Sequence, residues 1–232
     1  MRDSFINGII DDLFDLLYPV SCLVCGDRML KSSYLCPYCL DHAFVHTDRE
    51  GYESDSGFIL PDWISMQESL WHFDKGGYLQ ELLHHLKYSG LVDLGRVLGK
   101  ELGYKLEHHE MMQQFEKPRL MPVPIHSKRY RRRGYNQAEL IARGIAEVTG
   151  AGLIPGEVVT RVKNTPTQTG LDAKIRRRNI ADAFSCVQPQ ALREKDILIV
   201  DDVITTGATV MELASLLGRE AKSVGIVTVA RA

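Results

Sequence analysis

The residues best suited to chemistry lie together at the end of one apolar run, in the segment 196–210, DILIVDDVITTGATV. Two adjacent carboxylates, Asp201 and Asp202, follow four branched apolar residues. Two acids at the end of a buried strand cannot both point into a core, so at least one must meet solvent, a cation or a polyol. The residues after 209 follow helical spacing, and the free N–H groups at the start of a helix suit a phosphate. The segment therefore predicts a site for a sugar phosphate, with the carboxylates on its hydroxyls. The predicted phosphate-binding turn consists of Thr205, Thr206, Gly207, Ala208 and Thr209.

A second set of reactive residues is a doubled Cys-x-x-Cys pattern near the amino terminus. Ten residues separate the pair Cys22 and Cys25 from the pair Cys36 and Cys39. Two such pairs can place four sulfur atoms around one ion of borderline softness, most plausibly zinc. A redox dithiol needs only one pair, and a disulfide framework is disfavoured in a chain without a secretion signal. We therefore expect structural zinc, because four protein ligands leave no open position for catalysis.

Positive charge is concentrated in one part of the chain. Residues 119–180 hold 13 Lys or Arg against 4 Asp or Glu, whereas the rest of the chain holds 15 against 26 and the formal net charge is −2. Five of the six residues in 128–133 are basic, and they repel one another unless an anion lies among them. A second basic run, 174–179, follows a small polar stretch, 161–170, that is typical of a mobile loop able to close over a site. We expect the first run to be a loop, and its interleaved tyrosines suit single-stranded nucleic acid; a solvated charged loop is the alternative.

Apolar periodicity predicts an α/β fold around these residues. Residues 197–200 and 224–229 are continuous apolar runs, typical of parallel strands covered on both faces, and helical spacing lies between them. A short strand is expected at 119–124, before the first basic run, and a helix at 138–148, after it. We expect an open, twisted parallel sheet flanked by helices, with its ligand at the carboxyl ends of the strands.

The chain of 232 residues is long enough for one good-sized core and a small appendage. We expect residues 1–47 to form an amphipathic helix plus the cysteine module, residues 48–65 a linker, and residues 66–232 the α/β domain. The sequence contains no apolar stretch of the roughly 18 residues that a membrane span requires, and its amino terminus lacks the pattern of a signal peptide. We therefore expect a cytoplasmic protein that is not inserted in a membrane.

The thirteen residues 197–209 resemble the 5-phosphoribosyl-1-pyrophosphate (PRPP) signature of type I phosphoribosyltransferases. The wider order of motifs resembles the ComF family, also called competence protein F or GntX-like. The matching motifs are the doubled CxxC, PVP at 122–124, RRGYNQA at 132–138, RVKNTPTQ at 161–168, RRRN at 176–179 and the PRPP signature. Together they span nearly the full chain. Lys87, in LKYSG, also matches the family, without a role that the residues define.

This resemblance implies an amino-terminal zinc finger on a type I phosphoribosyltransferase domain that binds PRPP with Mg²⁺. The acids would bind ribose hydroxyls and the turn the 5′-phosphate. It also implies a role in natural transformation, with single-stranded DNA and a helicase-like competence ATPase as partners. Candidate residues for the diphosphate or a flexible loop are Arg133, Lys163 and Arg176. Candidate residues for nucleic acid are Lys128, Arg129, Arg131, Arg132, Tyr135, Arg177 and Arg178.

Two alternatives remain open at the level of sequence. One is an active phosphoribosyltransferase of nucleotide salvage, unrelated to DNA. The other is a non-catalytic adaptor that senses phosphoribose and holds a partner through its finger. No residue pattern identifies the acceptor base that a transferase would need, so the sequence leaves catalysis itself open.

Overall fold

The computed structural model of the chain describes residues 20–29, 34–48, 61–164 and 182–232. The chain divides into two compact units, Met1–Phe44 and Val45–Ala232. The predicted amino-terminal helix, most of the predicted linker and the second basic run, with Arg176, Arg177 and Arg178, lie outside the described residues.

The described part of the first unit is built around its cysteines. An isolated antiparallel bridge joins Ser21 to Arg28 on either side of the first Cys-x-x-Cys pair. The second pair belongs to a single short helix, α2 (Pro37–His42), which has Cys36 at its N-cap and proline in its first turn. Proline favours the first helical position because its missing N–H is not needed there.

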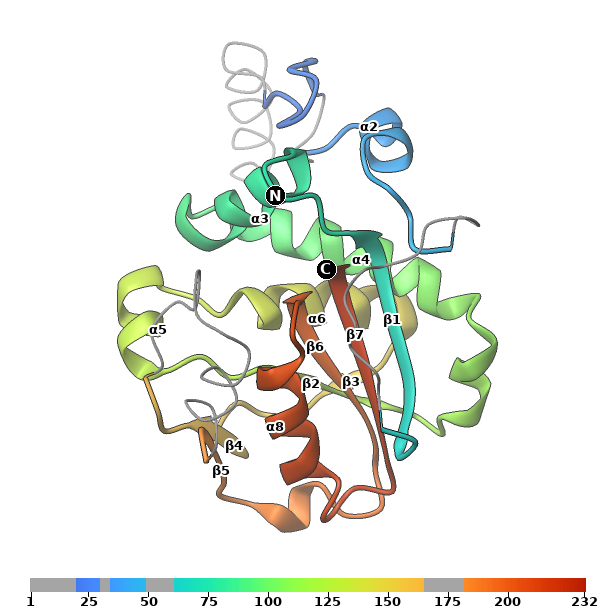
Figure 1. The fold of residues 1–232 in the computed structure, drawn as a ribbon, viewed down its shortest axis with the longest axis vertical. Helices are drawn as coiled ribbons and strands as arrows, with labels where there is room; N and C mark the ends of the chain where they lie inside the picture. The colour runs from blue at the N-terminus through green and yellow to red at the C-terminus, as the bar shows by residue number, and fades with distance from the viewer. Residues whose placement is uncertain (1–19, 30–33, 49–60, 165–181) are drawn as a thin grey trace, which may run out of the picture. The chain divides into compact units, whose positions relative to one another are not determined.

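The second unit contains a five-stranded parallel sheet (Figure 1). Its strand order is β1-β7-β6-β2-β3, and every neighbouring pair is parallel. The strands are β1 (Ile64–His72), β7 (Ser223–Arg231), β6 (Asp196–Ile204), β2 (Arg119–Pro122) and β3 (Gly152–Leu153). The carboxyl ends of β6 and β2 therefore meet at one edge of the sheet, and this arrangement confirms the predicted fold class.

Helices cover both faces of the sheet. In Figure 1, α8 (Ala208–Leu217) lies in front of the sheet, and α4 (Val92–Glu107) and α6 (Gln137–Thr149) lie behind it. The remaining described helices are α3 (Tyr78–Tyr88), α5 (Ser127–Arg133) and the 3₁₀ turns η1 (Glu110–Gln114) and η2 (Pro189–Ala191). Separately, β4 (Val159–Arg161) and β5 (Phe184–Cys186) form an antiparallel ribbon. None of the helices in the described ranges combines the length and the apolar character that a membrane crossing needs.

Burial explains why β6 is the centre of the sheet. Its first five residues are all buried, and Ile197 and Ile199 pack in one core cluster with Leu213 and Leu217 of α8. Continuous burial is the property expected of a strand covered on both faces. The strand extends through Ile204, beyond the two carboxylates at which the sequence suggested it would stop. The pairing partner β7 continues to Arg231, opposite Ile204, and this pairing keeps the strand extended.

Helix α6 is held at a fixed place by close packing on α4. A Cβ atom added at Gly99 of α4 would lie 2.1 Å from the carbonyl oxygen of Ile141 and 2.9 Å from the Cα of Gly144, both in α6. Only glycine allows two helices to approach this closely. The contact fixes α6, and with it the amino-terminal turn of α6, which contributes to the site at the end of β6.

Candidate functional site

The site is organised around the two carboxylates of β6. Asp201 and Asp202 are consecutive residues near the carboxyl end of β6, and their side chains interact with each other. Asp201 is partly exposed, whereas Asp202 is buried, with 3% of its surface exposed. The main-chain N–H of Asp202 donates a 2.9 Å hydrogen bond to Oδ1 of Asp201, which holds the first carboxylate against its own strand. The two acids predicted as a pair therefore occupy different environments.

Asp202 is held by two other elements. Nζ of Lys87, in the last turn of α3, forms an ion pair with Oδ2 of Asp202. Nε2 of Gln137, the first residue of α6, donates a 3.3 Å hydrogen bond to Oδ1 of the same carboxylate. The Asp202 carboxylate thus joins α3, α6 and β6 at the carboxyl edge of the sheet.

The network continues from Gln137 to the arginines. Arg133, the last residue of α5, donates to Oε1 of Gln137. The guanidinium carbons of Arg132 and Arg133 lie 5.9 and 5.4 Å from the ring centroid of Tyr88, within reach of cation–π attraction. These side chains surround a hollow of about 370 Å³. The residues that line it are Lys87, Tyr88, Gly90, Arg132, Arg133 and Tyr135.

The two carboxylates have opposite pKa shifts. Burial and the neighbouring charge of Asp202 raise the pKa of Asp201 well above its ordinary value. Burial also acts against ionisation of Asp202. The charge of Lys87 and the hydrogen bonds that Asp202 accepts outweigh this effect of burial, so the pKa of Asp202 is lowered. Burial lowers the pKa of Lys87 and Asp202 raises it, with the net direction upward. Asp202 is therefore the permanent anion of the pair, and Asp201 is the carboxyl whose charge a cationic or hydroxyl-bearing ligand would stabilise.

The turn after β6 presents the amino terminus of α8. Gly207 is the N-cap of α8, and its φ of +68° is one that residues with a side chain rarely adopt. No side chain at this position caps the helix by a hydrogen bond. The first N–H groups of a helix have no partners inside the helix. The predicted turn therefore has the backbone form of an anion site, with the half-exposed Thr206 and Thr209 beside Gly207.

The first basic run is a helix and not the loop that the sequence suggested. Helix α5 begins after His126, whose side chain accepts a hydrogen bond from the N–H of Lys128, and it ends at Gly134 in the left-handed region. Arginine and lysine are good helix formers, so two caps suffice to wind the run. No residue of α5 is buried. The helix carries Lys128, Arg129, Arg131, Arg132 and Arg133.

The charges of α5 are crowded. Partial burial of Arg129, followed by the neighbouring charge of Arg133, lowers the pKa of its guanidinium. A bound anion would stabilise such a group of neighbouring positive charges. Tyr135, predicted as a nucleic-acid contact, donates a 2.8 Å hydrogen bond from its hydroxyl to the carbonyl of Leu86 and so ties the end of α5 to α3.

The ribbon places one further cation beside this group. Arg161 of β4 lies with its guanidinium carbon 5.4 Å from the ring centroid of Phe184 in β5. Burial and the charge of Arg129 lower the pKa of Arg161, while Asp201 raises it, so Arg161 lies within electrostatic range of both groups. Lys163, predicted as a diphosphate contact, lies 3.8 Å from Asp182 at the exposed end of the ribbon.

The four predicted metal ligands come together in the first unit. The sulfur atoms of Cys22, Cys25, Cys36 and Cys39 all lie within 4.8 Å of one another. A tetrahedral ion with Zn–S bonds of about 2.3 Å would place its ligands about 3.8 Å apart, and Cys25 and Cys36 have a sulfur–sulfur distance of 3.8 Å.

Backbone geometry supports thiolates at this cluster. The N–H of Cys36 points at the sulfur of Cys22 at 3.4 Å, and the N–H of Cys39 at the sulfur of Cys36 at 3.3 Å. Burial opposes ionisation of Cys22, but N–H groups of the two knuckles lower its pKa to about 6, while burial and the neighbouring cysteines raise the pKa of Cys39, whose thiolate would need the charge of a bound ion. The donor set thus fits a soft divalent ion, because thiolates are the form that binds metal.

Two residues of the site have no assigned role in the sequence-based prediction. Lys87 lies in the last turn of α3, after a run of apolar residues on one helical face. Its partner Asp202 is 115 positions away in β6, so no local pattern reveals the ion pair. Gln137 is part of the RRGYNQA motif, which was the available signal, but its contact with Asp202 depends on how α6 packs on the sheet.

The chain is similar to several named proteins, although no family model matches it. DNA utilization protein YhgH of Escherichia coli (strain K12) is 31% identical over 202 residues, which cover 85% of this chain and 84% of the relative. Competence protein F of Haemophilus influenzae is 32% identical over 197 residues, covering 82% and 81%. Competence protein ComFC of Bacillus subtilis is 21% identical over 209 residues, covering 88% and 80%.

Proposed function

Because the chain belongs to the ComF-like family, to which proteins named for DNA utilization and competence also belong, we propose that it handles incoming DNA in natural competence. In this proposal the chain binds PRPP at the carboxyl end of β6 and single-stranded DNA along α5. The proposed role is cytoplasmic, where a strand that has entered the cell is received. A helicase-like competence ATPase is the proposed protein partner.

The observation that carries the PRPP proposal is the arrangement around β6. Strand β6 carries the carboxylate pair that begins at Asp201. Six residues later, Gly207 is the left-handed N-cap of the next element, helix α8. Helix N–H groups suit the 5′-phosphate, and the partly exposed carboxylate of Asp201 suits the ribose hydroxyls. Lys87 and Arg133 add positive charge on the side of Asp202. One sugar phosphate with a second phosphate group would use all three features.

A magnesium ion fits the same arrangement. The raised pKa of Asp201 reflects a carboxylate charge that its surroundings do not fully compensate. Mg²⁺ prefers oxygen ligands and is commonly held by one or two carboxylates together with phosphate oxygens. We propose that Asp201 contributes to holding the ion, and that the ion neutralises the diphosphate when both are bound. Lys87 and Arg133 would orient the diphosphate from the protein side.

The DNA proposal rests on the exposed cations of α5. None of the residues of this helix is fully buried, and partial burial together with the charge of Arg133 lowers the pKa of Arg129. Such a helix suits a flexible polyanion whose phosphates can follow it. Arg131 and Arg132 extend the same cationic surface, and the predicted contacts Arg177 and Arg178 would add to it from outside the described residues.

The zinc proposal concerns the cysteine cluster. Four thiol groups within 4.8 Å of one another offer a complete tetrahedral donor set. The ion would be structural, and we propose that the finger it folds is the surface for the protein partner. Zinc supplies no chemistry to the β6 site in this account.

Thermal unfolding tests the PRPP proposal. A ligand at 100 times its Kd adds about 2.7 kcal/mol to the free energy of unfolding, so PRPP with Mg²⁺ should raise the Tm by several degrees. The Asp201→Asn variant should lose this increase, and Asp93→Asn, at an exposed position in the first turn of α4, should keep it. No increase in the parent protein would refute PRPP binding. Release of diphosphate with a panel of nucleobases would then separate a transferase from a binding protein.

A further inference from the structure

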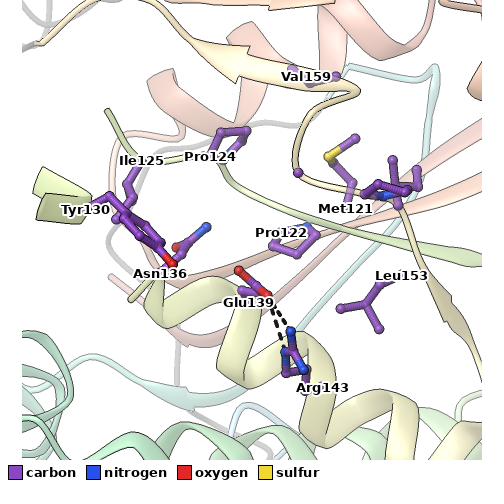
Figure 2. A pocket seen from close by; sticks show the side chains of 13 residues that line it. Met121, Pro122, Pro124, Ile125, Tyr130, Asn136, Glu139, Arg143, Leu153 and Val159 are labelled. Carbon is purple, nitrogen blue, oxygen red and sulfur yellow. Dashed lines mark hydrogen bonds and ion pairs between the residues drawn. The ribbon is translucent and has the colours of Figure 1, made fainter. Parts of the chain in front are cut away.

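A second pocket lies beside α5 and α6, at the carboxyl end of β2 and next to the edge strand β3. It has a volume of about 410 Å³ and is bordered by the end of β2, the first turns of α6 and the segment after β3 (Figure 2). Most of its wall is apolar, with contributions from Met121, Pro122, Leu153 and Ile154. None of the residues placed at the β6 carboxylates lines it.

One ion pair supplies the polar side of this pocket. Figure 2 shows the Glu139 carboxylate beside Asn136 and Pro122, joined to Arg143 by the dashed lines. Nε and Nη2 of Arg143 donate to Oε1 of Glu139 at 3.3 and 2.8 Å. Both hydrogen bonds end on the same oxygen, which leaves Oε2 as the oxygen for a ligand. Asn136 accepts from the N–H of Ala138 at 3.2 Å and donates to the carbonyl of Val123 at 3.0 Å, so its role is to fix the wall.

Tyr130, which lies beside Asn136 in Figure 2, gives the pocket an aromatic wall that connects to the cations. Tyr130 of α5 lines the pocket and is 50% exposed. A neighbouring hollow of about 410 Å³ shares Tyr130, Pro124 and Ile125 with the pocket and adds Arg131 and Arg161 to its border. A ligand can thus place a flat apolar group against Tyr130 while its anionic part meets arginines.

We infer that this pocket takes one unstacked nucleobase of the single strand whose phosphates lie along α5, and that it favours guanine. The Glu139 carboxylate accepts hydrogen bonds, and guanine offers it two adjacent donors, N1–H and the 2-amino group. The remaining N–H groups of Arg143 match the acceptor O6 on the same edge of the base. Thymine presents acceptor, donor, acceptor on that edge, which places an oxygen against the carboxylate.

The polar chemistry favours a base over an apolar side chain of a protein. A pocket built only for leucine or phenylalanine would gain nothing from a carboxylate at its wall, whereas the Glu139 carboxylate, 39% exposed beside Arg143, can accept hydrogen bonds from a base edge. Stacking on an aromatic side chain and hydrogen bonding of the exposed base edge are the usual means by which proteins recognise single strands. The inference rests on the proposed strand binding and adds a preference for one base to it.

The test compares short oligothymidylates that carry one central guanine, hypoxanthine or thymine, by fluorescence anisotropy at fixed salt. We expect the guanine strand to bind about tenfold more tightly than the thymine strand, the size of discrimination typical of one paired base edge. Hypoxanthine, which lacks the 2-amino group, should fall between them. Glu139→Gln should remove the preference, because it weakens binding of the guanine strand and relieves the repulsion between the carboxylate and the thymine oxygen. Glu147→Gln, the same substitution farther along α6 outside the pocket, should keep the preference.

The possible outcomes separate this inference from the proposed function. Salt-dependent binding of all three strands with equal affinity would overturn the base pocket and leave strand binding intact. A guanine preference that Glu139→Gln leaves unchanged would also overturn it. Absence of binding to any strand would refute the proposed DNA binding and this inference together. Tyr130→Leu gives an independent check, because it should weaken binding of the guanine strand by removing the stacking surface while Glu139 remains in place.

Discussion

Lys87 and Asp202 form an ion pair that joins the last turn of α3 to the end of β6. The Asp202 side chain is 5% exposed and that of Lys87 25%, so the pair is largely removed from water. Gln137 of α6 donates to the other oxygen of the same carboxylate. A single acidic side chain thereby fixes three elements at the carboxyl edge of the sheet and holds the Lys87 ammonium beside the proposed diphosphate position.

Replacement of Lys87 by methionine should be strongly destabilising. Loss of one partner from a buried pair leaves an uncompensated charge, which costs about 3–5 kcal/mol. Urea unfolding at neutral pH measures this cost. Lys100→Met is the matched control, because Lys100 is 44% exposed where it meets Glu147 at 3.0 Å, and such a pair contributes at most about 1 kcal/mol.

The pH dependence of the Lys87→Met variant gives a second check of the same pair. In the parent protein the pKa of Asp202 is lowered, so its contribution to the free energy of unfolding is present above the ordinary carboxyl pKa and is lost as the pH falls. Without Lys87 this lowering disappears. The destabilisation by Lys87→Met should therefore shrink as the solution is acidified. A cost below about 1 kcal/mol at neutral pH would show that water already solvates Asp202.

Replacement of Asp201 by asparagine should have the opposite effect on stability. Burial and the charge of Asp202 raise the pKa of Asp201, so the folded protein holds this proton more tightly than the unfolded chain does. Stability is then lost as the pH rises above the ordinary carboxyl value. Asparagine has no such titration, so the gain in stability should be absent near pH 4 and grow as the pH rises toward neutral.

The measurement is the difference in the free energy of unfolding between Asp201→Asn and the parent across this pH range, without ligand. A functional carboxylate that destabilises its own fold is the usual compromise between stability and activity. If Asp201→Asn were less stable than the parent at neutral pH, the carboxylate would be a structural group, and its role as the ligand-facing acid would be refuted.

The sequence predicted the sheet, the helix after β6 and the cysteine cluster because each follows from a local pattern. Apolar continuity in β6 and the spacing of the cysteines depend only on neighbouring residues. By contrast, β3, β4 and β5 contain two or three residues each, which is too short for any periodicity. The helical form of α5 was missed because five charges in six positions conceal a capped helix whose ends are His126 and Gly134.

The candidate site was predictable only in part for the same physical reason. Asp201 and Asp202 are adjacent in the sequence, but their different partners follow from which elements pack against each side chain. Lys87 meets Asp202 only because α3 ends beside β6, and Gln137 does so because α6 starts there. Contacts between distant elements depend on the tertiary arrangement, which one unaligned sequence does not report.

Substitution of a single cysteine should remove the metal. Cys25→Ser or Cys36→Ser breaks the tetrahedral donor set, so we expect zinc bound to the purified parent protein and none bound to either variant. Cys186→Ser is the control, because Cys186 lies in β5 and does not belong to the cluster. Zinc content is measured by mass spectrometry of the metal. Unchanged zinc content in both cluster variants would place the ion elsewhere.

Charge reversal on α5 should weaken strand binding in a salt-dependent way. For each phosphate of a single strand that the protein no longer neutralises, the slope of log K against log salt becomes shallower by about 0.7. Arg131→Glu should show this reduction, and Lys75→Glu, at an exposed turn before α3, should not. Titration of a labelled oligothymidylate at several salt concentrations gives both slopes. Equal slopes for the parent and Arg131→Glu would mean that this arginine does not bind a phosphate.

The contact between α4 and α6 should be intolerant of any side chain. A Cβ at Gly99 would lie 2.1 Å from the carbonyl oxygen of Ile141, and backbone atoms cannot move aside as a flexible side chain can. Gly99→Ala should therefore cost at least about 1–3 kcal/mol through overpacking, although alanine favours helices over glycine by about 1 kcal/mol. Gly156→Ala is the control, because a Cβ there meets no atom within 4 Å. Urea unfolding gives both values. Helix α6 carries Gln137, so displacement of this helix should also reduce the stabilisation that PRPP with Mg²⁺ gives to Gly99→Ala. A stable Gly99→Ala variant with full stabilisation by the ligand would show that α6 does not position the site.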